Sequence, residues 1–107
     1  MDRYGSVIRL RSDKVEEYIA LHRNVWDGVQ DVIRQCNIKN YSIFYKGGWL
    51  FSYFEYHGTD FKRDMAKMAS DRLTQEWWAL CEPCQEPLAG RSPGEWWASM
   101  SEIYHQD

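Results

Sequence analysis

The sequence 40-NYSIFYKGGWLFSYFEY-56 carries the strongest structural signal in this chain. Residues 40–45 and 49–56 are rich in aromatic and β-branched side chains, which favour strands. Lys46-Gly47-Gly48 separates the two runs, and paired glycines supply the positive φ angles of a tight hairpin turn. We therefore expect two antiparallel strands joined by a short turn.

A strand and a helix are predicted before this hairpin. Residues 3–10 alternate loosely between apolar and polar side chains, which predicts a first strand. Ser12 and Asp13 offer oxygens that cap a helix N-terminus. Apolar residues then recur at three- and four-residue spacing as far as Cys36, so one long helix is expected up to that residue.

Further helices are predicted after the hairpin. Thr59 or Asp60 is expected to cap a second helical region. Ser70-Asp71 should break and recap this region, and residues 73–80 form a further helical segment that stops near Pro83.

The C-terminal part predicts an irregular loop followed by a last strand. Residues 81–94 hold all three prolines and two glycines, and residues 95–104 have the pattern of a strand. The resulting order, β-α-β-β-α-β, is that of a ferredoxin-like α+β unit, an antiparallel sheet with its helices on one face. Because the other face would be uncovered, we expect a symmetric homodimer.

Length and composition restrict the function classes. A chain of 107 residues with 44% hydrophobic and 27% charged residues suits one globular domain over residues 1–107, with a thin core. Thirteen basic and sixteen acidic residues give a net charge of −3 without a long run of either sign, so neither nucleic acid nor membrane is an expected partner. No apolar run approaches the roughly 18 residues that span a bilayer, and no signal peptide is evident, so a cytoplasmic location is expected.

Tyr18, His22 and Trp26 are spaced four residues apart, and His22 and Tyr18 are the candidate catalytic residues among them. On a helix this spacing places all three side chains on one stripe, which must face the sheet. Imidazole, with an unperturbed pKa of about 6.5, can give and take a proton near neutral pH. A phenol, with a pKa near 10, is better suited to holding or relaying a hydrogen bond. These groups would then line a pocket that the helix and the sheet leave open. The alternative is that all three residues pack in the core.

Two tryptophan pairs have different interpretations. Adjacent helical residues point about 100° apart, so Trp77 and Trp78 cannot both occupy the centre of one small core, and one should line a cleft. Indole faces commonly stack on the C–H faces of sugars, and a pocket needs few further polar groups to orient a ligand. Trp96 and Trp97, as strand residues, would point to opposite faces and serve packing.

The Cys81-Glu82-Pro83-Cys84 motif suggests neither a metal site nor a redox site. Cys36 and the other histidines lack the spacing that would complete a zinc site. The motif follows a helix and has Glu82 beside it, which opposes formation of a thiolate. An odd number of cysteines agrees with a reducing compartment. No metal and no cofactor are expected.

Several of these segments, in the same order and over about residues 3–87, resemble the L-rhamnose mutarotase family. The matching segments are Glu16-Glu17-Tyr18 with His22 and Trp26, Asn40-Tyr41-Ser42-Ile43, Leu50-Phe51 leading to Glu55, and Trp77-Trp78. The resemblance implies a dimeric α+β barrel built from ferredoxin-like units.

The resemblance also implies an activity and a site. His22 would be the general acid, Tyr18 would assist it, and the sugar-binding residues would be Tyr18, Tyr41, Trp77 and Trp78. The implied reaction interconverts the α and β anomers of a 6-deoxy-hexose, a monosaccharide, by general acid–base opening and closing of its ring. Because residues 95–105 depart from the family, L-fucose competes with L-rhamnose as the substrate. Tyr18, Glu55 and a bound water are all candidates for the second proton transfer.

Two other function classes stay open. The same barrel hosts small monooxygenases, either cofactor-independent or haem-dependent, in which a helix histidine would bind iron. A non-catalytic sugar-binding module is the other alternative, since a fold alone does not establish an activity.

Overall fold

The computed structural model describes all 107 residues as a curved five-stranded sheet with four helices. The strands are β1 (Asp2–Leu10), β2 (Ile38–Lys46), β3 (Trp49–Tyr56), β4 (Gln85–Glu86) and β5 (Ala98–Met100), and the helices are α1 (Val15–His22), α2 (Asp27–Gln35), α3 (Phe61–Ser70) and α4 (Arg72–Cys81). The strand order is β2-β3-β1-β4, with β5 also paired to β1, and every pairing is antiparallel. This order confirms the predicted ferredoxin-like α+β fold.

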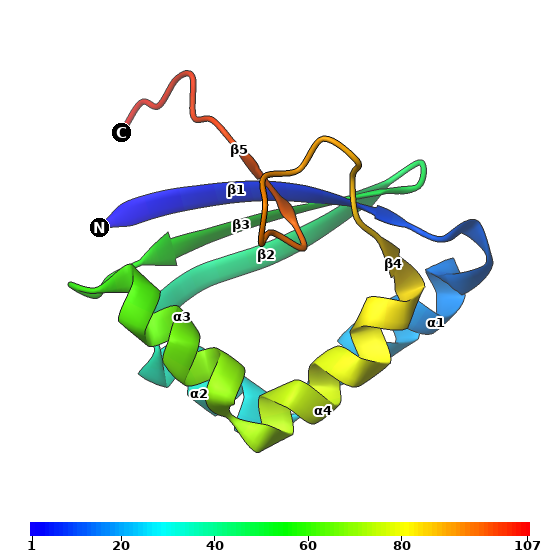
Figure 1. Ribbon diagram of the computed structural model, residues 1–107, viewed down its shortest axis with the longest axis horizontal. Coiled ribbons are helices and arrows are strands. Elements are labelled where there is room, and N and C mark those ends of the chain that lie inside the picture. The colour runs from blue at the N-terminus through cyan, green and yellow to red at the C-terminus, as the bar shows by residue number, and fades with distance from the viewer.

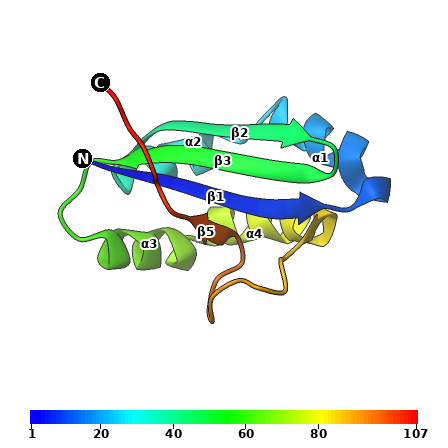
Figure 2. The ribbon, with the colours of Figure 1, turned by 90° about the horizontal axis from the view of Figure 1, so that it is seen from above.

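The helices all lie on one side of the sheet (Figure 1). Figure 2 looks onto the opposite face, where β1, β2 and β3 lie in front of the helices and no helix covers them. We call the helix side the concave face and the other side the outer face. No helix in the chain has the length and apolar character needed to cross a bilayer.

The predicted hairpin is confirmed at both strands and at the turn. Lys46 pairs with Trp49, and the two residues between them, Gly47 and Gly48, have φ angles of +53° and +89°. These positive values are those of a tight hairpin turn.

A bulge interrupts β2 near its start. Lys39 pairs with Glu55 and Ser42 with Tyr53, so two residues, Asn40 and Tyr41, face Phe54 alone. Bulges re-aim side chains. Here Tyr41 is directed to the concave face, where its ring packs edge-on against Phe54 with 5.8 Å between the ring centroids.

The prediction of one long helix as far as Cys36 is wrong, because the chain leaves the helix after His22 and starts α2 at Asp27. Trp26 is extended, with a ψ angle of 135°. The side-chain amide of Gln30 donates to the carbonyl of Val25 at 2.9 Å, which satisfies one backbone group within the break.

One glycine and two helix caps set the helix arrangement. A Cβ atom on Gly28 would lie 2.4 Å from Cδ2 of Leu73, so the glycine allows α2 to approach α4 closely. Asp60 caps α3 by accepting from the amide of Arg63. Asp71 ends α3 and caps α4 by accepting from the amide of Thr74, which confirms the predicted break and recapping.

The predicted last strand over residues 95–104 is wrong in extent, because only Ala98–Met100 pair with the sheet. A second short strand, Gln85–Glu86, lies inside the segment predicted as an irregular loop. Both strands pair with β1, β5 as far as Val7 and β4 at Leu10. Proline lacks the amide proton needed to extend a ladder, and Pro87 and Pro93 separate the two strands.

The core is thin, as predicted, because only 15 of the 107 residues are buried. The main cluster lies between the concave face and helices α1, α2 and α4, and consists of Ile8, Leu10, Tyr18, Val29, Leu50, Trp77, Cys81 and Cys84.

Candidate active site

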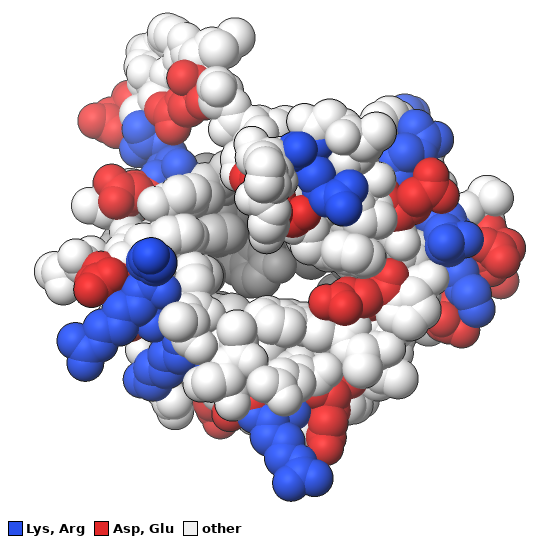
Figure 3. Space-filling model, in the orientation of Figure 1, with Lys and Arg blue, Asp and Glu red and all other residues white.

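A cavity of about 1210 Å³ lies between the concave face of the sheet and the helices. Figure 3 shows a hollow at the centre of the molecule, bordered mainly by uncharged side chains, with acidic atoms at one edge. All five residues predicted from the sequence line this one cavity: Tyr18, His22, Tyr41, Trp77 and Trp78. The fold therefore brings together residues from α1, β2 and α4.

His22 is the last residue of α1 and is held by aromatic rings and one hydrogen bond. Its ring stacks on Tyr18, with 4.2 Å between the centroids, and meets Trp77 edge-on at 5.4 Å. Its Nδ1 atom lies 2.8 Å from the backbone oxygen of Tyr18. Because a carbonyl oxygen only accepts, Nδ1 must carry the proton, which leaves Nε2 free to accept a proton and to return it.

Tyr18 is only 3% exposed and lines the cavity together with Gln85. The side-chain amide of Gln85 donates to the Tyr18 hydroxyl oxygen at 3.1 Å. Burial raises the pKa of Tyr18 well above its usual value near 10, while the Gln85 hydrogen bond opposes part of that rise. The phenol therefore stays protonated at neutral pH, which suits a hydrogen-bond donor and not a base.

The aromatic wall of the cavity is formed by Tyr41 from β2 and by Trp77 and Trp78 from α4. Trp77 is buried and Trp78 half-buried, yet both reach the cavity. Trp26 stands beyond the end of α1 and packs on Trp77, with 5.2 Å between the ring centroids, without lining the cavity. The predicted stripe thus supplies two cavity residues, Tyr18 and His22, and one packing residue.

The structure adds polar groups that sequence reasoning missed. Ser6 on β1 and Ser52 on β3 line the cavity, with their hydroxyl oxygens 2.5 Å apart. The available signal was a small polar residue at an inward-facing strand position, since Ser6 lies between Tyr4 and Ile8 on the concave side. Gln85 had no such signal, because it lies in a segment without periodicity.

The interpretation of Trp96 and Trp97 as strand residues on opposite faces is wrong. Both precede β5, in a bend of the chain, and both line the cavity. A bend releases them from the strict alternation of a strand, so the two indoles can turn toward the same space.

Glu55 lies on the outer face of the sheet, away from the cavity. It alternates with Phe54, which lines the cavity, and accepts hydrogen bonds from Asn40 at 2.7 Å and Tyr53 at 2.8 Å. These two hydrogen bonds lower the pKa of Glu55. Its position removes it as a proton-transfer group for a ligand in the cavity of its own chain.

Cys81 and Cys84 are packing residues in this structure. Both are buried, and burial raises the pKa of Cys81 to about 12 and that of Cys84 to about 11. The Cys84 thiol also donates to the carboxylate of Glu17 at 3.1 Å. No group of three or more His, Cys, Asp or Glu side chains is arranged to hold a metal ion.

Known proteins resemble this chain in sequence and in fold. The profile of the L-rhamnose mutarotase family matches residues 3–106. The L-rhamnose mutarotase of Oceanobacillus iheyensis is 28% identical over 109 residues, which cover 100% of both chains.

Two solved structures share the fold. The L-rhamnose mutarotase of Formosa agariphila superposes with a TM-score of 0.78 at 16% identity, and the alignment covers 100% of both chains. Tetracenomycin F2 cyclase of Streptomyces glaucescens superposes with a TM-score of 0.75 at 14% identity, covering 100% of this chain and 98% of the cyclase. At these identities the two structures indicate a common fold and nothing about the reaction.

Proposed function

Since the chain belongs to the L-rhamnose mutarotase family, a family of isomerases, we propose that its cavity opens and recloses the ring of L-rhamnose and so interconverts the α and β anomers. The observation that carries the proposal is the state of His22. The Nδ1–H group of His22 donates a hydrogen bond to the backbone carbonyl of Tyr18. Its Nε2 atom has no protein partner and lies in an aromatic cavity.

Ring opening requires two proton transfers and no change of oxidation state. Protonated His22 gives the Nε2 proton to the ring oxygen while the bond from that oxygen to C1 breaks. The anomeric hydroxyl loses its proton to a water, which leaves an open-chain aldehyde. After rotation about the C1–C2 bond, the former ring oxygen attacks the other face of C1 and returns its proton to Nε2, and the aldehyde oxygen regains a proton.

Tyr18 and the aromatic wall supply binding and orientation in this proposal. Tyr18 stays protonated, so it donates a hydrogen bond to the sugar and leaves the second proton transfer to water. Trp77, Trp78 and Tyr41 offer ring faces and edges for the C–H groups and the 6-methyl group of the sugar. L-fucose carries the same methyl group, so it is the second candidate substrate.

The test is anomer exchange of L-rhamnose and of L-fucose, followed by exchange NMR with and without protein. We expect the wild type to accelerate exchange and His22→Ala to lose roughly 10²–10⁴-fold of that acceleration, the contribution of one general acid–base group. His105→Ala, in the exposed C-terminal tail, is the matched control and should keep wild-type exchange.

Each other outcome contradicts part of the proposal. Undiminished exchange by His22→Ala removes His22 from the mechanism. Binding of the sugar without anomer exchange identifies a binding module. Haem absorbance of the protein, with His22 as the iron ligand, identifies the haem-dependent monooxygenase class.

We further propose a homodimer formed through the outer face of the sheet, on which Phe51 lies between Val7 and Phe44 across three strands. Phe44 is 62% exposed and Phe51 is exposed beside it. Covering a contiguous apolar strip removes it from water, and a second copy of the same face is the simplest complement.

A cytoplasmic location completes the proposal. All three cysteines, Cys36, Cys81 and Cys84, are free thiols. Free thiols are the usual state in a reducing compartment.

A further inference from the structure

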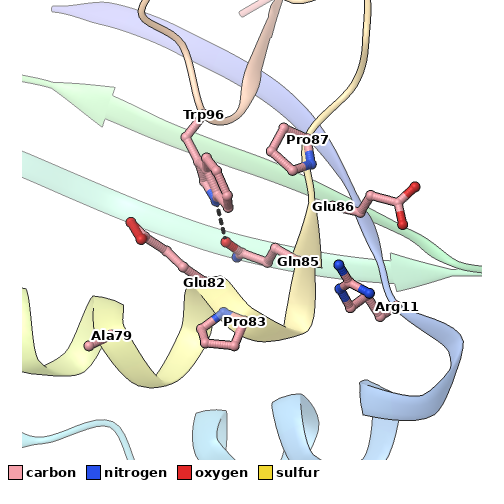
Figure 4. A pocket seen from close by; sticks show the side chains of 8 residues that line it. All are labelled: Arg11, Ala79, Glu82, Pro83, Gln85, Glu86, Pro87 and Trp96. Carbon is pink, nitrogen blue, oxygen red and sulfur yellow. Dashed lines mark hydrogen bonds between the residues drawn. The ribbon is translucent and has the colours of Figure 1, made fainter.

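Two hydrogen bonds connect Trp96 to Tyr18 through Gln85. The indole Nε1 of Trp96 donates to Oε1 of Gln85 at 2.7 Å, as Figure 4 shows, and Nε2 of Gln85 donates to the hydroxyl of Tyr18 at 3.1 Å. Gln85 is only 5% exposed, and its backbone pairs with Leu10 of β1. Its side-chain amide is held at the oxygen by Trp96 and at the nitrogen by Tyr18.

The chemistry of the groups fixes the direction of both hydrogen bonds. An indole N–H can only donate, so the amide oxygen of Gln85 must face Trp96. The amide NH₂ must then face Tyr18, whose oxygen can only accept from it. The hydroxyl proton of Tyr18 is therefore not used by Gln85, and no other protein group accepts it.

We propose that Trp96 and Gln85 are positioning residues that turn the Tyr18 hydroxyl into a hydrogen-bond donor for an oxygen of the bound sugar. This inference rests on the proposed function. It assigns a role to two residues beyond the five that the sequence indicates.

The surroundings agree with such a role. Gln85 and Trp96 line the main cavity and also a smaller pocket of about 380 Å³, whose lining residues Figure 4 shows, so both spaces adjoin this pair of residues. The backbone carbonyl of Tyr18 also holds Nδ1 of His22. A fixed Tyr18 therefore aligns the donor hydroxyl with the imidazole that moves the proton. The raised pKa of Tyr18 keeps the hydroxyl protonated.

The sharpest test compares Gln85→Glu with Gln85→Met. An ionised carboxylate at position 85 accepts from both neighbours, so it draws the Tyr18 proton away from the sugar. Met leaves that proton free and removes only the orienting amide. At pH 8 we expect the Glu variant to lose roughly tenfold more anomer-exchange rate than the Met variant, the equivalent of one hydrogen bond. A merely structural role predicts instead that the rate loss of each variant follows its loss of unfolding free energy in urea, because an ionised carboxylate at this buried position also destabilises the fold.

The pH profile supplies a second reading. A protonated carboxyl has the amide's pattern, with one oxygen accepting from Trp96 and one O–H donating to Tyr18. The Glu variant should therefore recover as the pH falls through the pKa of this buried carboxyl. The charged and titratable groups around position 85 are Tyr18, Arg11, Cys81, Glu82, Cys84 and Glu86. Dividing the exchange rate of each variant by the wild-type rate at the same pH removes the pH dependence that these groups and His22 give to all the proteins alike.

Two controls complete the design. Gln35→Glu makes the same charge change at an exposed end of α2 and should behave as the wild type. Tyr18→Phe removes the hydroxyl, so adding Gln85→Glu to it should cost nothing more. Trp96→Phe frees the amide to rotate, and we expect its rate to lie between those of the wild type and Gln85→Glu.

The proposal is overturned if Gln85→Glu is no worse than Gln85→Met, if its loss does not change with pH, or if its loss adds fully to that of Tyr18→Phe. A wild type that binds L-rhamnose without exchange contradicts the proposed function alone. In that case the same order of variants is measured in L-rhamnose dissociation constants, and the opposite order there overturns the positioning role.

Discussion

The imidazole of His22 and the phenol of Tyr18 are separated by one helical turn, and Tyr18 contacts the imidazole with both its backbone and its ring. Its carbonyl holds Nδ1 of His22, and its ring stacks on the imidazole at 4.2 Å. Replacing the tyrosine ring therefore removes the donor hydroxyl and also changes the packing of the His22 imidazole. This explains why a four-residue spacing on one short helix matters to the proposed chemistry.

The thiols give a prediction at the residue scale. Their raised pKa values leave very little thiolate at pH 8, so Cys81 and Cys84 should react slowly with iodoacetamide in the folded protein. In urea all three cysteines should react at the rate of a free thiol. Mass spectrometry of the labelled protein measures both rates. Fast labelling of Cys81 or Cys84 in the native state would contradict a packing role.

The hairpin turn is the element with the clearest backbone requirement. Gly47 and Gly48 both have positive φ angles, but Gly47, at +53°, lies in the region that asparagine tolerates. Gly48, at +89°, is further from any region that side chains favour.

This difference predicts unequal effects of substitution. Gly48→Ala should lower the free energy of unfolding by about 1–2 kcal/mol, the cost of a left-handed residue with a side chain. Gly47→Asn, with no atom within 4 Å of its Cβ position, should stay within about 0.5 kcal/mol of the wild type. Urea unfolding at one fixed protein concentration provides the comparison, and equal destabilisation by both changes would contradict the assigned turn.

The helices show how a local signal can mislead about an element. Apolar spacing continues from α1 into α2, although the backbone between them is not helical. The break lets Trp26 pack on Trp77, and α2 lies against α4 with the Leu73 side chain close to Gly28. Tertiary packing thus overrides a continuous helical pattern.

At the scale of the whole molecule, the uncovered outer face predicts an assembly. The wild type should sediment as a dimer at micromolar concentration, and Phe44→Glu should sediment as a monomer, because it buries a charge in the proposed interface. Leu80→Glu makes the same kind of change at an exposed position on α4, outside the cavity and the outer face, and should stay dimeric. A monomeric wild type, or a dimeric Phe44→Glu, would contradict the proposed interface.

The C-terminal tail adds a feature to the same outer face. Arg3 on β1 forms an ion pair with Glu102 at 2.9 Å, and the tail runs over this end of the sheet in Figure 2. Ile103 and Tyr104 in the tail are both exposed. The tail therefore borders the proposed dimer interface.

The sequence by itself determined the features that depend on neighbours along the chain. Gly47 and Gly48 specify the turn, Asp60 and Asp71 specify helix starts, and the four-residue spacing places Tyr18 and His22 on one helix face. These features follow from backbone angles, caps and periodicity, which act over a few residues.

Only the tertiary structure decided which distant groups meet. Gln85 reaches Tyr18 from 67 positions away, and Trp96 completes the connection from a bend that no periodic pattern marks. Ser6 and Ser52 meet because their strands pair in one register. Such contacts depend on how the sheet curves and on where helices break. The spacing of the residues already indicated Tyr18, His22 and the Trp77-Trp78 pair, whereas Gln85, Trp96, Ser6 and Ser52 join the site only in the packed chain.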